Sequence, residues 1–418
     1  MVERQSHNEL LTHLFRQEYT KMTAVLCRHF GLKHFEIAED IASETFLKAS
    51  EYWAINGVPD NPTAWLYTVA KNKARDYFKN LSIFETRIRD QFTAENDESG
   101  HSYEISTQLI SDSQLAMIFA VCNPANSSKG QICLALQVLC GFSIEEISEA
   151  FLTKTETIKK RLHRARMNLR NDNFEIERLN KNDIDMRLDV VLKTLYLLFN
   201  EGYFSRSNDR QVRGELCSEA MRMMLLLTEN PLTNTAQANA LLALMCYQSS
   251  RLEARTSDKG EPILFEEQDK HLWDETLVDR GNYYLVRATD TGEVSKYHLE
   301  AGIAYWHTTG KEDIKWQNIL GLYNRLILIE YSQVTALNRT FAFAMVYGCQ
   351  EALAEAQKLE LEGSSSYHAL LGHLYSGLDS TKATEHFHIA ISLTKSKAEK
   401  QTLSKKIQRL PDGHTSVK

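Results

Sequence analysis

The densest concentration of positive charge in the chain lies between Lys154 and Arg170. This segment contains seven Lys or Arg residues and a single acid, Glu156. Clustered bases neutralise phosphate groups, and such binding depends on where the charge lies, so a net charge of −7 over 418 residues does not exclude it. We predict that the following residues contact DNA: Lys154, Thr155, Glu156, Thr157, Lys159, Lys160, Arg161 and Arg164.

The same part of the chain has the apolar spacing of two short helices. Apolar residues recur at helical steps in two stripes, first at Ile144, Ile147 and Phe151 and then at Ile158, Leu162, Ala165 and Leu169. Thr153, with Glu156 three residues later, has the pattern of a capping box at the start of the second helix. The pattern predicts a helix-turn-helix whose second helix enters the major groove. The alternative is a solvated helix with a basic face.

Aromatic and basic residues alternate in a second segment, which Asn61 as cap and Pro62 at the first helical position mark as a helix. Such a surface holds a phosphate backbone while its rings stack on unpaired bases. The loop 52–60 before it is a candidate pocket for a base turned out of the duplex. The predicted contacts with opened DNA are Trp53, Tyr67, Lys71, Asn72, Lys73, Arg75, Tyr77 and Lys79. Trp65, Leu66, Val69 and Ala70 are expected to point inward. The alternative for this helix, with aromatic rings in the core and bases in solvent, applies to Trp65 and to about half of the other aromatic residues.

A third helix, around residues 37–49, has one apolar and one acidic face. Ile37, Ile41 and Ala49, with Thr45 or Phe46, form the face that we expect to be buried. The opposite face is acidic, and an acidic helix face by itself is ordinarily just solvated. The residues on or behind this face are Glu39, Asp40, Ser43, Glu44 and Phe46, and only the family resemblance described below implies that they form a protein contact.

The whole chain is predicted to be all-α, because helical periodicity dominates and only 18 Gly and 6 Pro interrupt it. Breaks in that periodicity suggest four parts: a helical bundle at 8–82, an acidic flexible linker at 83–112, a helix-turn-helix unit at 113–172 and a long helical unit at 183–418. Leu371, Gly372, Tyr375, Ala383, Phe387 and Ala390 have the spacing of a tetratricopeptide-like repeat, and Ala352, Ala356 and Leu359 recur 31 residues earlier.

Evidence for covalent chemistry is weak in this sequence. Glu201, Asp269, His298 and His307 are polar residues within apolar helices, but such residues usually satisfy helix ends or core hydrogen bonds. His386 and His388 would point to different faces of one helix. The seven cysteines form no C-x-x-C pair. We therefore expect no catalysis, no cofactor and no metal site, with reduced thiols in a cytoplasmic protein that has no membrane-spanning segment.

Taken together, the two N-terminal helices and the helix-turn-helix resemble the extracytoplasmic-function type of RNA polymerase sigma factor. AEDIASETFLKA resembles the helix of region 2 that binds the polymerase β′ coiled coil, and NPTAWLYTVAKNKARDYF resembles the segment that melts and reads the −10 element. FSIEEISEAFLTKTETIKKRLHRAR resembles the −35-reading helix-turn-helix of region 4. The resemblance places Asp40, Glu44 and Phe46 at the polymerase contact and Asn72, Arg75 and Asp76 in the −10 segment. Many relatives have Gln where this chain has Ser43.

The rest of the chain resembles the C-terminal extension of one subgroup of these factors, which is tetratricopeptide-like (DUF6596-type). The similar segments are LLFNEGYFS, LLALM, EEQDKHLWD, YHLEAGIAYWH and ALNRTFAFA. The resemblance implies promoter DNA and core RNA polymerase, through its β′ coiled coil and β flap, as partners. It also implies that the extension regulates activity in place of a separate anti-sigma factor, with a YCII-like (DGPF) protein or another regulator as its partner.

Two other functions remain open from the residues alone. A one-component helix-turn-helix regulator with a sensing helical domain would bind duplex DNA without polymerase, and it has no use for the two N-terminal helices. A repeat scaffold or co-chaperone would bind proteins and would lack a salt-dependent affinity for DNA.

Overall fold

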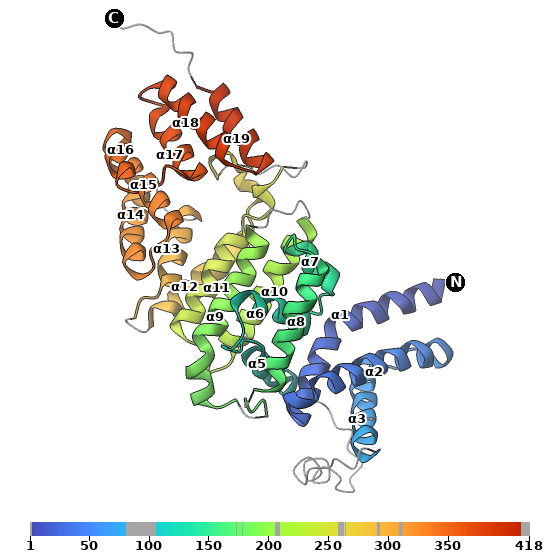
Figure 1. The fold of residues 1–418 in the computed structure, drawn as a ribbon. Coiled ribbons are helices and arrows are strands. Elements are labelled where there is room, and N and C mark those ends of the chain that lie inside the picture. The colour runs from blue at the N-terminus through green and yellow to red at the C-terminus, as the bar shows by residue number, and fades with distance from the viewer. Residues whose placement is uncertain are drawn as a thin grey trace, which may run out of the picture. The chain divides into compact units, whose positions relative to one another are not determined.

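The computed structural model describes residues 2–80, 106–172, 174–177, 179–204, 210–257, 263, 265–290, 293–308 and 312–410. This part of the chain is built of helices and contains no β-strand, which confirms the all-α prediction (Figure 1). The chain forms two compact units, Met1–Asn234 and Thr235–Lys418. No helix among the described residues is both long enough and apolar enough to cross a membrane.

The first helices form the N-terminal bundle, which comprises α1 (Val2–Phe30), the short η1 (Leu32–His34), α2 (Phe35–Asn56) and α3 (Pro62–Asn80). Phe35, Trp53 and Leu66 are almost completely buried at its centre. On α2 the expected face at Ile41, Thr45, Phe46 and Ala49 is buried. Asn61 caps α3 by accepting a hydrogen bond from the amide of Ala64, as its position in the sequence predicts.

The next four helices form the helix-turn-helix module: α5 (Thr107–Val121), α6 (Ser128–Cys140), α7 (Ile144–Ala150) and α8 (Thr155–Arg170). The α8 stripe Ile158, Leu162, Ala165 and Leu169 is buried as predicted. Of the linker expected at 83–112, residues 83–105 lie outside the described residues, and the remainder includes the first turns of α5, which Ser106 caps.

The predicted capping box at Thr153 and Glu156 is wrong. Lys154 occupies the cap position of α8 without a side-chain cap, while the Thr153 hydroxyl donates to the carbonyl of Phe151 within the turn. Glu156 instead pairs with Lys159. A capping box does form one helix earlier: the side chains of Ser143 and Glu146 each accept from the other's backbone amide at the start of α7.

Two further helices, α9 (Lys181–Tyr203) and α10 (Arg210–Glu229), belong to the first unit and not to the second. We call them the covering hairpin, because they pack on α5 and α6. The Thr194 hydroxyl donates to Gln131 Oε1 at 3.2 Å, and the Arg222 guanidinium donates to the carbonyl of Leu139 at 3.0 Å. The long helical unit expected at 183–418 is thus divided between the two compact units after Asn234.

The second unit is a succession of helices in which chain neighbours pack together. In order they are α11 (Ala236–Ser249), η2 (Glu253–Arg255), η3 (Phe265–Glu267), η4 (Lys270–Leu272), α12 (Glu275–Arg287), η5 (Ala288–Asp290), α13 (Lys296–Thr308), α14 (Glu312–Ile329), α15 (Gln333–Tyr347), α16 (Cys349–Gln357), α17 (Ser365–Tyr375), α18 (Ser380–Leu393) and α19 (Lys397–Gln408). Gly372 of α17 lies so close to Phe387 of α18 that a Cβ would stand 2.6 Å from the ring. The close approach of α17 and α18 at Gly372 agrees with the small-residue spacing in the sequence. That these helices form a tetratricopeptide-like repeat stays a prediction.

Candidate nucleic-acid interface

Helix α8 presents its bases on the side away from its buried stripe. Lys154, Lys159, Lys160 and Arg164 are exposed, as is Glu156, which pairs with Lys159 at 3.0 Å. The N-terminal part of α8 therefore offers a cationic surface with one acid within it. Such a surface can neutralise phosphates while side chains near the helix start reach base edges.

Three members of the predicted set on α8 are only half-exposed: Thr155, Thr157 and Arg161. Thr155 Oγ1 lies 3.4 Å from the hydroxyl of Ser148 on α7. Arg161 interacts with Cys133 of α6, where burial raises the pKa of the thiol while the charge and the hydrogen bond of Arg161 oppose that rise. Thr155 and Arg161 thus also take part in holding α8 against the rest of the module.

The aromatic residues of the N-terminal bundle divide into core and surface groups. Trp53 is 2% exposed and Tyr67 is 4% exposed, so neither presents a surface to DNA in this structure, contrary to our expectation. The Tyr67 hydroxyl donates a 3.1 Å hydrogen bond to Glu18 Oε2, and burial raises the pKa of Tyr67 well above its ordinary value. These two large rings fill the core of the bundle and so anchor α2 and α3.

Other members of the set predicted to contact opened DNA are at least partly exposed. Asn72 and Tyr77 are exposed on α3, and Lys71, Lys73 and Arg75 are half-buried. The side chain of Lys79 lies outside the described residues. Tyr52, which lies in α2, stacks on Trp65 near the start of α3, with ring centroids 5.5 Å apart. Residues 52–56 of the expected loop are thus the end of α2, and only 57–61 connect the two helices.

The acidic face of α2 is exposed at Asp40, Ser43 and Glu44. Phe46 is buried instead, packing edge-on to Phe15 at 5.1 Å, which places it behind this face as a support. Glu44 forms an ion pair with Lys73 of α3, in which Lys73 Nζ lies 2.6 Å from Glu44 Oε2. A protein bound to α2 and DNA bound to α3 would therefore meet at one ion pair.

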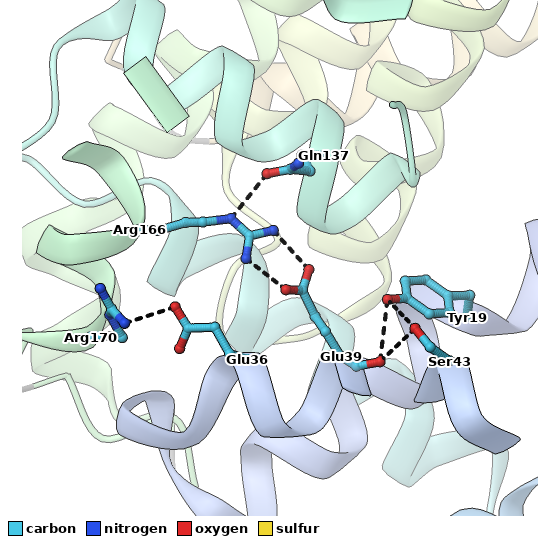
Figure 2. A network of polar contacts seen from close by, with 7 residues as sticks. All are labelled: Tyr19, Glu36, Glu39, Ser43, Gln137, Arg166 and Arg170. Carbon is cyan, nitrogen blue, oxygen red and sulfur yellow. Dashed lines mark hydrogen bonds and ion pairs between the residues drawn. The ribbon is translucent and has the colours of Figure 1, made fainter. Parts of the chain in front are cut away.

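Glu39 has a different environment from the rest of this face. It forms a two-pronged ion pair with Arg166 of α8, with contacts of 2.6 and 2.9 Å, and both side chains are 19% exposed (Figure 2). Arg166 also donates to Gln137 Oε1 at 3.1 Å and lies 5.0 Å from the centroid of the Phe35 ring. One predicted protein-binding residue is thus already engaged by the helix-turn-helix module.

A second pair lies beside the first, where Arg170 Nη1 stands 2.9 Å from Glu36 Oε1 (Figure 2). Neither Arg166, Arg170 nor Glu36 was among the predicted site residues. The available signal was their spacing, because Glu36 and Glu39 on α2 and Arg166 and Arg170 on α8 each share one helix face. Nothing in that spacing says which acid meets which base.

The polar residues considered for catalysis have local structural partners. Asp269 caps η4, and His298 donates from Nε2 to the carbonyl of Ala288. His307 packs edge-on against Phe265 and Trp316.

The two histidines of α18 also differ from each other. His386 Nδ1 lies 3.0 Å from Nδ1 of His368, while His388 is exposed. Among the described residues no three His, Cys, Asp or Glu side chains gather as metal ligands would.

Comparison with known proteins gives three family-model matches. The model described as Sigma-70 region 2 matches residues 14–82, Sigma-70, region 4 matches 129–169, and a family of unknown function (DUF6596) matches 187–289. The chain is 30% identical to Uncharacterized protein R00370 of Rhizobium meliloti over 381 residues, which cover 90% of this chain and 89% of that protein.

Two shorter relatives match the N-terminal part. RNA polymerase sigma factor YlaC of Bacillus subtilis is 25% identical over 39% of this chain and 92% of its own length. A probable RNA polymerase sigma factor of Haemophilus influenzae is 26% identical over 32% of this chain and 76% of its own. No solved structure matches.

Proposed function

Since this chain belongs to the sigma-70 family of RNA polymerase sigma factors, we propose that it binds core RNA polymerase through α2 and directs it to promoters through α3 and α8. The observation that carries this proposal is the presence in one chain of regions 2 and 4, with part of each predicted contact face exposed. Asp40 and Glu44 are available on α2, and Lys154, Lys159 and Lys160 are available on α8. A regulator that only binds duplex DNA has no need for the α2 and α3 surfaces.

In this proposal the exposed acids of α2 meet a basic surface on the polymerase β′ coiled coil, and region 4 meets the β flap. Charge complementarity of this kind increases the rate of encounter and fixes the register of the complex. Bases on α8 hold the −35 duplex by its phosphates, while residues near the start of α8 contact base edges.

Region 2 would act on the −10 element after the duplex opens. Asn72 and Tyr77 are exposed on α3, so they can meet an unpaired strand without rearrangement of the core. The stacked rings of Tyr52 and Trp65 lie beside the loop that would hold a flipped base. These steps position and open DNA and require no covalent chemistry by the chain.

The proposal is tested by co-elution of the full chain with sigma-free core polymerase, followed by in vitro transcription. The paired reversal Asp40→Lys with Glu44→Lys should abolish co-elution while the circular dichroism spectrum stays unchanged, because both side chains are exposed and the Glu44–Lys73 ion pair that it breaks lies at the surface. Lys193→Glu is the matched control, since it reverses an exposed charge on α9. Unchanged co-elution of the paired variant would show that α2 is not the polymerase contact, and failure of the wild-type chain to co-elute would refute the proposal.

The role of the C-terminal part needs a truncation placed by the structure. A chain ending near Asn182 would lack the covering hairpin, including buried side chains such as Leu195, Leu198 and Phe199. The surfaces of α5 and α6 on which the hairpin packs would then be exposed. A chain ending at Asn234 keeps the first compact unit whole. We propose that the second unit regulates activity, so transcription by this shorter chain should differ from that of the full chain, in amount or in response to an added YCII-like (DGPF) protein.

A further inference from the structure

The last helix of the second unit, α19 (Figure 1), lies in a segment with a local excess of positive charge. From Lys395 to Arg409 there are six Lys or Arg residues and one acid, Glu399, in a chain whose net charge is −7. None of the three family matches reaches this segment. Surface charges are screened over about 8 Å at physiological salt, so a polyanion close to α19 responds to the local charge and not to the net charge.

The apolar core of the second unit fixes which side of α19 faces solvent. Leu403 lies in one buried cluster with Phe387 and Ala390 of α18, and Ile407 and Leu410 pack against that cluster. Because residues at steps of three and four share one helix face, the opposite side of α19 is turned outward. The exposed bases on this side and just before the helix are Lys395, Lys397, Lys400 and Lys405, which we call the α19 lysine surface.

The single acid of this segment is turned into the second unit. The half-buried Glu399 carboxylate accepts a 2.9 Å hydrogen bond from the hydroxyl of Ser365 on α17, and its other oxygen accepts from the hydroxyl of Thr394. At the far end of the helix, Arg409 pairs with Glu267, so we do not count it in the surface. Since two hydroxyl groups hold the Glu399 carboxylate, it does not interrupt the α19 lysine surface.

The neutral side chains around these lysines favour nucleic acid over a protein as the ligand. Gln401, Ser404 and Gln408 are exposed, and among the side chains that the structure describes on α19 no apolar one is exposed. Protein interfaces are enriched in aromatic residues and depleted in Lys, whereas Lys, Ser and Gln commonly contact phosphate groups. Duplex DNA carries one charge per about 1.7 Å of its axis, so a helix about 18 Å long can meet several phosphates.

We propose that the α19 lysine surface is a second DNA-binding surface, which holds the phosphate backbone of duplex DNA without reading its sequence. It adds affinity to that supplied by α8 and anchors the second unit on DNA. The contact requires neither polymerase nor a promoter, so it stands or falls independently of the proposed function.

The proposal is tested by fluorescence anisotropy of a labelled random-sequence duplex with the full chain at several salt concentrations. Lys397→Glu with Lys400→Glu should weaken binding, and the slope of log affinity against log salt concentration should become shallower by about two, since each lost phosphate contact removes roughly 0.9. Lys397→Arg with Lys400→Arg should retain wild-type affinity, because a guanidinium also pairs with phosphate.

The matched control is Lys33→Glu with Lys193→Glu, which makes the same change in net charge at exposed positions of the first unit. It should keep the wild-type salt slope. The circular dichroism spectrum of the α19 glutamate variant should also be unchanged, because acids near the start of a helix are favoured by its dipole.

The contact is located by photo-cross-linking with p-benzoylphenylalanine placed at Gln401 of the full chain. Irradiation with the labelled duplex should give a protein–DNA adduct. The same group at Gln350, an exposed position on α16, should give none, because α16 carries two acids and no Lys or Arg.

An unchanged salt slope in the α19 glutamate variant, or no adduct at Gln401, would overturn the proposal. If this variant keeps the wild-type slope but no longer co-elutes with core polymerase, the lysines contact protein and not DNA. Failure of the wild-type chain to co-elute with polymerase would refute the proposed function and leave the DNA measurements as they are, so the two proposals fail separately.

Discussion

Arg187 of the covering hairpin forms an ion pair with Asp172, which directly follows the helix-turn-helix module, at 2.9 Å and with both side chains about nine-tenths buried. The same guanidinium lies 4.4 Å from the centroid of the Phe174 ring and donates to the carbonyl of Phe119 in α5. Asp172 also accepts from Asn123 at 3.0 Å. One residue at the start of the DUF6596 match thereby joins α5 to the segment 172–174 that follows α8.

Replacing Arg187 with Met should destabilise region 4, because it leaves Asp172 charged and buried with its principal partner removed. Loss of one member of a buried pair costs about 3 kcal/mol. Hydrogen exchange of the full chain should show protection of the α5 and α6 amides falling by a corresponding amount. Lys193→Met, an exposed change on the same helix, should leave that protection unaltered, and equal exchange in both variants would show that Arg187 does not hold the module.

Lys160→Ala should weaken binding to −35 duplex DNA, because one phosphate contact is lost. The slope of log affinity against log salt concentration should become shallower by about one. Lys160 is exposed, so the stability of the fold should not change. Binding is measured by fluorescence anisotropy with polymerase holoenzyme at several salt concentrations. A salt slope identical to that of the wild type would place Lys160 outside the interface.

Arg161→Ala should combine a binding defect with a packing defect, since Arg161 is half-buried beside Cys133. Its melting temperature should fall, unlike that of Lys160→Ala. Thermal unfolding followed by circular dichroism distinguishes the two variants. A loss of −35 binding at unchanged melting temperature would mean that Arg161 acts through DNA alone.

Alkaline pH should destabilise the first unit partly through Cys122. Burial raises the pKa of Cys122 to about 12, opposed by its hydrogen bond with Thr194 and by the charge of Arg187. The unfolded thiol ionises near pH 8.5, so the unfolded state loses a proton that the folded state keeps, and stability falls from about that pH toward pH 12. Cys122→Ala should flatten this decline in denaturant titrations, and an unchanged slope would show that the thiol is not responsible.

Acidic pH should destabilise the second unit through His307. Burial, followed by the charges of Arg251 and Lys315, lowers the pKa of His307 to about 4. The unfolded imidazole takes up a proton near pH 6.5 while the folded one stays neutral, so stability is lost as pH falls from 6.5 toward 4, by roughly 3 kcal/mol over the window. His307→Phe should remove this part of the pH dependence, as measured by hydrogen exchange of α13 and α14. Retention of the full dependence would assign it to another group.

The local part of the structure could be predicted from sequence because its causes are local. Stripes at steps of three and four residues placed Ile158, Leu162 and Leu169 in the core, and Asn61 with Pro62 located the start of α3. The sequence did not show which helix starts with a capping box, since Ser143 and Thr153 are each followed by an acid three residues later. Only Ser143 forms the box, with Glu146. Backbone geometry in the turn decided between them.

The sequence by itself determined that the chain is helical, that a cationic helix follows a short turn, and that acids and aromatic residues line two earlier helices. Only the tertiary structure decided that Tyr67 hydrogen-bonds to Glu18, that α9 and α10 cover α5 and α6, and that Glu39 meets Arg166. Residues 127 positions apart carry no shared periodicity, and a surface rich in acids and bases offers many pairings of similar energy. Packing of the apolar faces selects among them, because it fixes which charged side chains are brought within reach.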